Sequence, residues 1–201
     1  MTPRPYQSRD RQKNVDAGRE RIIVAACELL ESEGDESFSI DAVARRAGIA
    51  RMTVYNQFDS KAGLLESIFD ALSQRGAMSR MSEIFSEPDP FLALDRMVEV
   101  FGQFWTSSRR VHRRLRAAAM HDAELAAAME QRNERRRRGL TELIGRIPAD
   151  RPLPIERDEA IRVLFVLLSF QSFDAIAGEG RTPADVVPLV QRIARLILGA
   201  T

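Results

Sequence analysis

The sequence predicts an all-α protein of about nine helices, and three observations support this prediction. Apolar residues recur at spacings of three and four along most of the chain, which is typical of amphipathic helices. No segment alternates apolar and polar residues at period two for long enough to indicate a sheet. Glycine and proline interrupt the helical pattern repeatedly, so we expect helices joined by turns.

The composition is that of an ordinary globular chain. Of 201 residues, 44% are hydrophobic and 29% are charged, and the formal net charge is only +1. This net charge does not by itself indicate a nucleic-acid partner. The single cysteine, Cys27, excludes an internal disulfide and is expected to be a small buried core residue.

No segment of the sequence predicts a secreted or membrane protein. Residues 1–21 are polar and lack the apolar stretch of a secretory signal. The most apolar segment, 163–170, is far shorter than the ~20 residues that a membrane-spanning helix needs. We therefore expect no membrane association and a cytoplasmic location.

The first part of the chain divides into an arm and four helical segments. Residues 1–17 carry prolines and an excess of basic charge without periodicity, so we expect a flexible basic arm. A helix is expected from about Ala17 to Glu33, where Gly34 stops it. Three more helices are expected, at about 40–47, 50–58 and 61–72.

The stretch from Ser39 to Lys61 has the physical pattern of a helix-turn-helix. Its first helix presents the small inward side chains Val43, Ala44 and Ala47, which let a second helix pack closely. The turn contains Gly48, which tolerates a positive φ. Three apolar residues are expected to hold the second helix against the core: Ile49, Val54 and Phe58.

The outward face of the second helix carries side chains of which only Met52 is apolar. Polar groups and an aromatic hydroxyl in this place suit phosphates and base edges of DNA. Lys61 follows the predicted cap of the next helix, where free N–H groups and a positive charge favour phosphate binding. The alternative is a packing module of short helices that binds no DNA. The candidate DNA-binding residues are Ser39, Arg51, Met52, Thr53, Tyr55, Asn56, Gln57 and Lys61.

A characteristic set of residues is distributed between Arg21 and Leu65. Its members are Ala25–Ala26, Leu29–Leu30, Gly34, Ile40, Val43–Ala44, Ala47–Gly48–Ile49, Thr53–Val54–Tyr55, Phe58, Ser60–Lys61 and Leu64–Leu65. By this set, the segment resembles the DNA-binding domain of the tetracycline-repressor-like (TetR/AcrR) family. The resemblance implies that Thr53, Tyr55 and Lys61 contact phosphates, and that Arg51, Met52 and nearby side chains face bases. Many relatives have glycine in place of Met52, which either contacts a thymine methyl group or shifts the helix outward.

The resemblance also implies a division of the chain and a function. Residues 18–72 would form the DNA-binding domain, and 73–201 a helical domain for ligand sensing and dimerisation. The arm at 1–17 would then enter a minor groove or remain a disordered tail. The implied function is a transcriptional repressor that a small-molecule effector releases from a palindromic operator. The alternative is a helical small-molecule or protein-binding module without DNA binding.

Five further helices are expected downstream, at about 90–107, 109–120, 122–147, 156–177 and 183–198. The last two, 156–177 and 183–198, have wide apolar faces, so we expect them to form a homodimer interface. A deep monomer core is the alternative. Pro188 either kinks the last helix or lies in its first turn, with Asp185 as cap.

An effector pocket is expected between the central helices, although each candidate is also a plausible core residue. Residues 109–138 hold ten arginines against four acidic residues, which either solvate a helix face or bind an acidic effector. The candidate lining residues are Phe101, Phe104, Trp105, Leu115, Met120, Met129, Phe170 and Phe173.

The sequence does not indicate an enzyme. It contains two histidines, and neither is part of a Glu-x-x-His pair of the kind that helical bundles use to bind iron. It has no phosphate-binding loop, dinucleotide motif, nucleophile elbow or zinc-ligand spacing. We therefore expect no catalytic residues, no metal and no cofactor.

Overall fold

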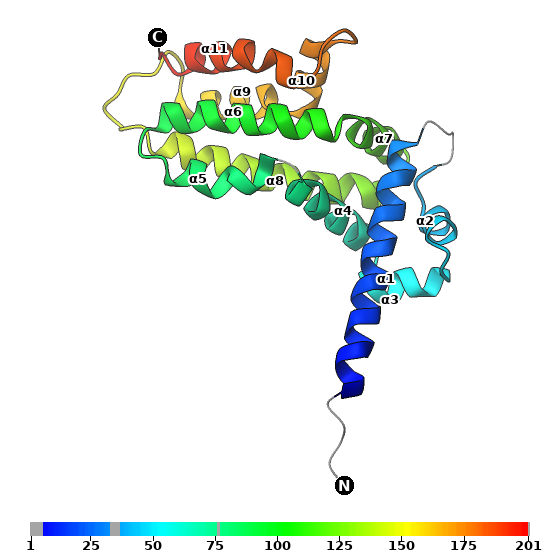
Figure 1. The fold of residues 1–201 in the computed structure, drawn as a ribbon. Coiled ribbons are helices and arrows are strands. Elements are labelled where there is room, and N and C mark those ends of the chain that lie inside the picture. The colour runs from blue at the N-terminus through cyan, green and yellow to red at the C-terminus, as the bar shows by residue number, and fades with distance from the viewer. Residues whose placement is uncertain (1–5, 33–36, 76, 201) are drawn as a thin grey trace. The chain divides into compact units, whose positions relative to one another are not determined.

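The computed structural model describes residues 6–32, 37–75 and 77–200, and these residues form helices and connecting turns with no strand among them. Within these ranges, eleven α-helices and two short 3-10 helices follow one another. Figure 1 shows the arrangement of the α-helices. The all-α fold class is thus confirmed, with more helices than the nine or so expected from the sequence.

The chain divides into two compact units. The N-terminal unit consists of Met1–Ala71 together with Arg113–Ala128, and the C-terminal unit of Leu72–His112 together with Met129–Thr201. A single boundary near residue 72 would therefore miss the later segment that joins the N-terminal unit.

The N-terminal unit is built on helix α1 (Tyr6–Glu31). Ile22, Leu29 and Leu30 of α1 are at most 1% exposed, and Cys27 is buried as expected. The helix begins well before the expected start at Ala17, so residues 6–17 are helical and that part of the flexible-arm prediction is wrong. Periodicity missed them because they are polar, yet no proline or glycine interrupts them. Residues 1–5 and the expected stop at Gly34 lie outside the described residues.

Helices α2 (Ile40–Ala47) and α3 (Arg51–Phe58) form the helix-turn-helix beside α1 (Figure 1). Ser39 caps α2, because its Oγ accepts a hydrogen bond from the Ala42 N–H at 3.2 Å. Gly48 ends α2 in the left-handed region, with φ of +66°. On α3, Val54 is fully buried and Phe58 is 4% exposed. The predicted turn and the inward side of α3 are therefore confirmed.

The rest of the N-terminal unit comes from the greater part of α4 (Lys61–Arg75), the second half of α7 (Arg109–Ala119) and the start of α8 (Ala123–Gly145). Leu115 and Leu125 are fully buried. Arg114 donates a hydrogen bond from Nη1 to the carbonyl oxygen of Ser32, just after α1, at 2.5 Å. These long-range contacts join the segment 113–128 to the N-terminal unit.

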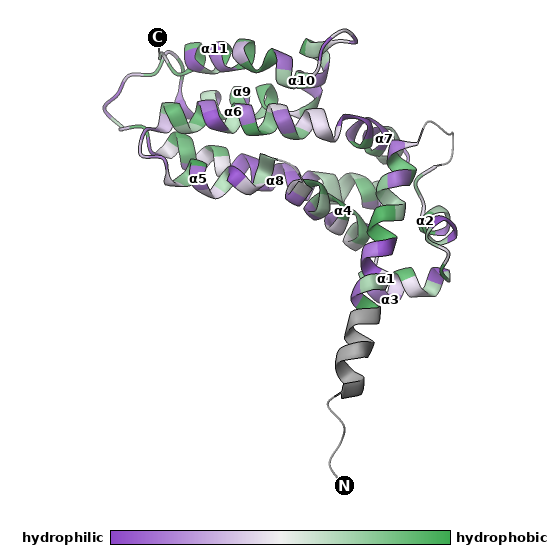
Figure 2. Ribbon diagram, in the orientation of Figure 1, coloured by the Kyte–Doolittle hydropathy of each residue, from purple (hydrophilic) through white to green (hydrophobic). Residues whose placement is uncertain are grey.

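In the C-terminal unit, more than half of the residues of helix α6 (Pro90–Ser107) are buried. Asp89 caps this helix by accepting a hydrogen bond from the N–H of Phe91. Figure 1 shows α9, α10 and α11 on one side of α6, and α5 and α8 on the other. In Figure 2, α11 carries both hydrophobic and hydrophilic colours along its length, as expected of an amphipathic helix. The remaining elements are η1 (Ala77–Arg80), α5 (Met81–Ser86), α9 (Arg157–Leu167), α10 (Phe170–Ala177), η2 (Ala184–Val186) and α11 (Val187–Ile197).

The single helix expected over 156–177 is wrong, because it breaks into α9 and α10 with a bend of 58°. At the break, Ser169 adopts an extended conformation, and its Oγ caps α10 by accepting from the Ser172 N–H. The continuous apolar run concealed this cap. In the last helix, Pro188 lies in the first turn of α11, as one of the two alternatives holds, but Asp185 does not cap this helix, because the N-cap residue is Val186.

Candidate DNA-binding and ligand-binding sites

The outward face of α3 is accessible. Arg51, Met52 and Asn56 are exposed, with Met52 reaching 64%, whereas Thr53 and Tyr55 are half-buried. None of the α3 candidates is sealed in the core, so the arrangement separates a packing side from a polar side as the sequence predicts. A short helix with a free polar side can approach the major groove of DNA.

Arg51 is held on this face by two neighbours. Its Nη1 lies 3.2 Å from Oδ2 of Asp41 in α2, and its Nη2 donates to the Tyr55 hydroxyl at 3.4 Å. The hydrogen bond with Tyr55 and then the charge of Asp41 raise the pKa of Arg51 above its usual value. Both members of the ion pair are more than half exposed, and such pairs are weak, so DNA can replace them.

Contacts from α1 position the end of α3. Arg19 donates to the Gln57 carbonyl oxygen at 2.5 Å and to Ser67 Oγ in α4 at 2.7 Å. Its guanidinium also lies 4.3 Å from the centre of the Phe58 ring. Gln57 in turn donates from Nε2 to the Val15 carbonyl oxygen at 3.3 Å. Gln57 therefore has a structural contact, and the sequence did not reveal the positioning role of Arg19.

Two other candidates are also engaged within the protein. The Ser39 hydroxyl is the cap of α2 described above. The Lys61 ammonium lies 2.5 Å from Oδ2 of Asp122 and 5.3 Å from the centre of the Phe38 ring. The side chain of Lys61 is only 16% exposed. The lysine expected to bind a phosphate is thus present at the start of α4, but its ammonium group is paired with a carboxylate.

Several of the expected ligand-binding residues form one aromatic cluster in the C-terminal unit. The rings of Phe101, Phe104, Trp105 and Phe170 are all buried, and Trp105 lies 4.9 to 5.8 Å from each of the other three. His112, not among the candidates, is buried with them, and its ring centre lies 4.8 Å from that of Trp105.

The other ligand candidates are distributed differently. Phe173 is fully buried in α10 and Met129 is half-buried in α8. Leu115 is core of the N-terminal unit. Met120 belongs to the same unit and is 79% exposed, which does not fit a pocket lining in the isolated chain.

Arg136 lies beside the aromatic cluster and has no acidic partner within salt-bridge distance among the described residues. It donates from Nη1 to the Leu168 carbonyl oxygen at 2.9 Å, the same atom that accepts from Trp105 Nε1 at 3.3 Å. Its guanidinium stacks 4.4 Å from the Phe165 ring, and its Nε is buried without a hydrogen-bond partner. Burial lowers the pKa of Arg136 to about 10. The sequence did not single out this residue among the arginines of 109–138.

Other members of this arginine-rich stretch have structural contacts. Arg109 pairs with Asp174 at 2.5 Å and donates to two carbonyl oxygens after α10. Arg137 pairs with Glu134 on the exposed side of α8. The stretch is therefore more than a uniformly solvated face.

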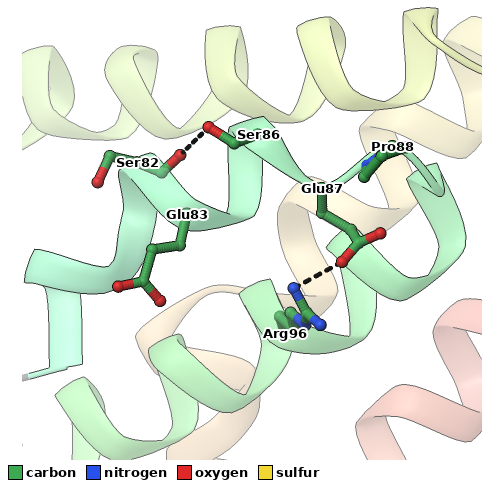
Figure 3. A pocket seen from close by; sticks show the side chains of 6 residues that line it. All are labelled: Ser82, Glu83, Ser86, Glu87, Pro88 and Arg96. Atoms are coloured by element: carbon green, nitrogen blue, oxygen red, sulfur yellow. Dashed lines mark hydrogen bonds and ion pairs between the residues drawn. The ribbon is translucent and has the colours of Figure 1, made fainter.

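An open surface pocket of about 350 Å³ lies between α5 and the start of α6 (Figure 3). Glu87 reaches across it to Arg96, with 2.6 Å between Oε2 and Nη1, and the Ser86 hydroxyl donates to the Ser82 carbonyl oxygen. None of the expected ligand-binding residues lines it. The lining residues are Ser82, Glu83, Ser86, Glu87, Pro88 and Arg96.

The described ranges hold neither a cluster of metal-ligating side chains nor a single membrane-spanning helix. No three His, Cys, Asp or Glu side chains gather there as metal ligands would. No single helix of those ranges is long and apolar enough to cross a bilayer, although α9 and α10 would pass that test as one bent pair.

A helix α2 with one buried side, a glycine turn and an α3 with an exposed polar face make up a helix-turn-helix, a motif that many DNA-binding proteins use. Residues 22–68 match the family model described as "Bacterial regulatory proteins, tetR family". This segment of the chain is therefore similar to the tetR family, as the resemblance of its sequence implies.

Two curated relatives show where the sequence similarity lies. The HTH-type transcriptional regulator EthR of Mycolicibacterium smegmatis is 34% identical over 102 residues, which are 50% of this chain and 47% of that protein. The nucleoid occlusion factor SlmA of Vibrio cholerae is 33% identical over 81 residues, 40% of this chain and 41% of that protein. The matched segments thus span less than half of each relative.

Solved structures support the fold over nearly the whole chain. A transcriptional regulator of the TetR family from Rhodococcus sp. has a TM-score of 0.68 at 17% identity, covering 90% of this chain and 98% of that one. A TetR transcription regulator from Haloarcula marismortui has a TM-score of 0.65 at 17% identity, covering 92% and 97%. At 17% identity these structures show that the fold is shared, and they do not indicate which ligand the chain binds.

Proposed function

We propose that the protein is a homodimeric, cytoplasmic transcriptional regulator that binds a palindromic DNA operator. A small-molecule effector bound in the C-terminal unit would release it, so that it acts as a repressor without a catalytic role. The accessible polar face of α3, held in place by buried Val54 and Phe58, is the observation that carries this proposal.

The contacts with DNA divide into two kinds. Thr53, Tyr55 and Lys61 are proposed to bind phosphates and so to fix the position of α3. Arg51 and Met52 are proposed to face base edges in the major groove, because they are the most exposed long side chains of α3. Asn56 is exposed on the same helix and is a further candidate for base contacts.

A dimer is supported by exposed apolar side chains on two adjacent helices of the C-terminal unit. Val163 and Val166 of α9 are 45% and 61% exposed, and Leu196 of α11 is 65% exposed. Contiguous exposed apolar groups favour a protein–protein contact. A two-fold dimer through 156–177 and 183–198 would present its two α3 helices at a separation of ~34 Å, one turn of DNA, or a multiple of it.

The effector is proposed to carry both an apolar body and an anionic group. The aromatic cluster around Trp105 supports the apolar body, and Arg136, a largely buried cation with an unsatisfied Nε, supports the anion. Thermal shift assays with benzoate and decanoate test this class of ligand. Stabilisation of the wild type that Arg136→Met abolishes and Arg135→Met preserves would support it. Equal shifts in all three proteins would contradict it.

The DNA-binding proposal is tested by fluorescence anisotropy on palindromic duplexes at several salt concentrations. Loss of one phosphate contact per subunit in Lys61→Gln should reduce the slope of log K against log salt by about 1.8 for a dimer, since each contact contributes ~0.9. A folded dimer that binds no duplex in such a series would instead favour the alternative, a helical binding module without DNA affinity.

A further inference from the structure

Two acidic side chains occupy the start of α4, where a DNA phosphate is proposed to bind. The Lys61 ammonium contacts Asp122 Oδ2 at 2.5 Å, and the Ala62 N–H donates to Glu124 Oε1 at 3.0 Å. All four residues belong to the N-terminal unit. We call Asp122 and Glu124 the acidic clasp.

The clasp is held in place by the beginning of α8. While Oδ2 of Asp122 faces Lys61, Oδ1 accepts a hydrogen bond from the Leu125 N–H at 3.0 Å and so caps α8. Leu125 itself is fully buried, which anchors this turn in the core of the unit. The Asp122 carboxylate is therefore oriented toward Lys61 before any ligand arrives.

The Lys61–Asp122 pair is less exposed than the Arg51–Asp41 pair on the outward side of the helix-turn-helix. Its side chains are 16% and 27% exposed, whereas those of Arg51 and Asp41 are each 57% exposed. The hydrogen bond from Lys61, and then that from the Leu125 N–H, lower the pKa of Asp122 below its usual value. The carboxylate is therefore ionised at neutral pH.

A carboxylate and a phosphate use the same donors. Both are anions that accept hydrogen bonds from an ammonium group and from the free N–H groups at a helix N-terminus. A phosphate that reaches Lys61 and the first turn of α4 must displace the carboxylates or share donors with them, at the cost of repulsion between like charges.

We propose that the acidic clasp competes with the DNA backbone for Lys61 and the α4 N-terminus, and thereby sets the affinity of the protein for DNA. This inference rests on the proposed function, because it requires that Lys61 binds a phosphate. The clasp holds the phosphate site closed in the DNA-free protein, and operator binding opens it in each subunit.

The test is to remove the charge of Asp122 and measure DNA affinity. Asp122→Asn retains an oxygen that caps α8, so the fold should be kept. Its affinity for a palindromic duplex should rise between about twofold and thirtyfold in a dimer that loses two such ion pairs. Asp150→Asn is the matched control, since Asp150 is an exposed aspartate in the loop before α9, and it should leave affinity unchanged.

A double variant shows whether the expected increase in DNA affinity depends on Lys61. In Lys61→Gln, the additional change Asp122→Asn should give no further increase, since the competing partner is gone. Glu124→Gln should give a smaller gain than Asp122→Asn, because Glu124 is exposed and contacts a backbone N–H.

The possible outcomes distinguish failure of the clasp proposal from failure of the DNA-binding proposal on which it rests. If the wild type binds DNA and Lys61→Gln weakens it, but Asp122→Asn behaves like Asp150→Asn or binds more weakly, the clasp proposal is overturned and the DNA-binding proposal stands. If none of the folded proteins binds any duplex, the proposed function itself fails, and the clasp with it.

Discussion

Replacing Tyr55 by phenylalanine isolates one proposed phosphate contact without disturbing the fold. The hydroxyl accepts a long hydrogen bond from Arg51 at 3.4 Å on an exposed face, so its removal should cost the fold little. A hydrogen bond to a charged group contributes about 1.5 to 3 kcal/mol, and a dimer loses two. We therefore expect about 3 to 6 kcal/mol less binding free energy, or roughly a 10²-fold to 10⁴-fold weaker affinity for the operator.

Fluorescence anisotropy at fixed salt measures the affinity, and a circular dichroism melt measures the stability. Thr141→Val, which removes a hydroxyl from the exposed side of α8, is the matched control and should bind as the wild type does. Because Tyr55 is neutral, the salt slope of Tyr55→Phe should also equal that of the wild type. An affinity within twofold of the wild type in a folded Tyr55→Phe dimer would refute the assignment of this hydroxyl to a phosphate.

Three further changes test the architecture. Gly48→Ala should lower the free energy of unfolding by about 1 to 2 kcal/mol from the left-handed backbone alone, since no atom lies within 4 Å of the added Cβ; an unchanged denaturant midpoint would contradict this. Gly102→Ala should cost about 1 to 3 kcal/mol, because its Cβ would lie 2.2 Å from Cγ2 of Val187 in α11; a melting temperature equal to that of the wild type would show that the two helices do not approach so closely. Val166→Glu should convert the dimer to a monomer in light scattering, whereas Leu92→Glu, an exposed apolar site on α6, should leave it dimeric; a dimeric Val166→Glu would place the interface elsewhere.

Local periodicity was sufficient for the helix-turn-helix. The apolar residues Val54 and Phe58 recur at the spacing of one helical face, so their burial and the exposure of Met52 follow directly from the sequence. Gly48 was equally predictable, because a sharp turn after a short helix demands a residue that tolerates a positive φ.

What the sequence missed depends on contacts between distant residues or on polar helices. Asp122 lies 61 positions from Lys61, and no local pattern relates the two. The early start of α1 at Tyr6 was not predicted, because residues 6–16 have helix propensity but no apolar periodicity. The start of α10 could have been predicted from Ser169, since serine is a favoured N-cap residue. The surrounding apolar run instead suggested one continuous helix.

The aromatic cluster of the C-terminal unit could also be predicted in part from local periodicity. Aromatic side chains on the buried stripe of α6 indicated the cluster around Trp105, because aromatic residues at helical spacing gather in cores. Arg136 was hidden among neighbouring arginines, and only the fold shows that its guanidinium, unlike that of exposed Arg135, turns toward Phe165 and Leu168.

Selection from a random duplex library tests the central claim most directly, because it assumes no operator. The wild-type dimer should enrich a palindrome whose half-sites lie about one DNA turn or a multiple of it apart. Met52→Ala should change the bases preferred within each half-site and keep their spacing. If the folded dimer enriches no sequence, the outward face of α3 is not a DNA-recognition surface.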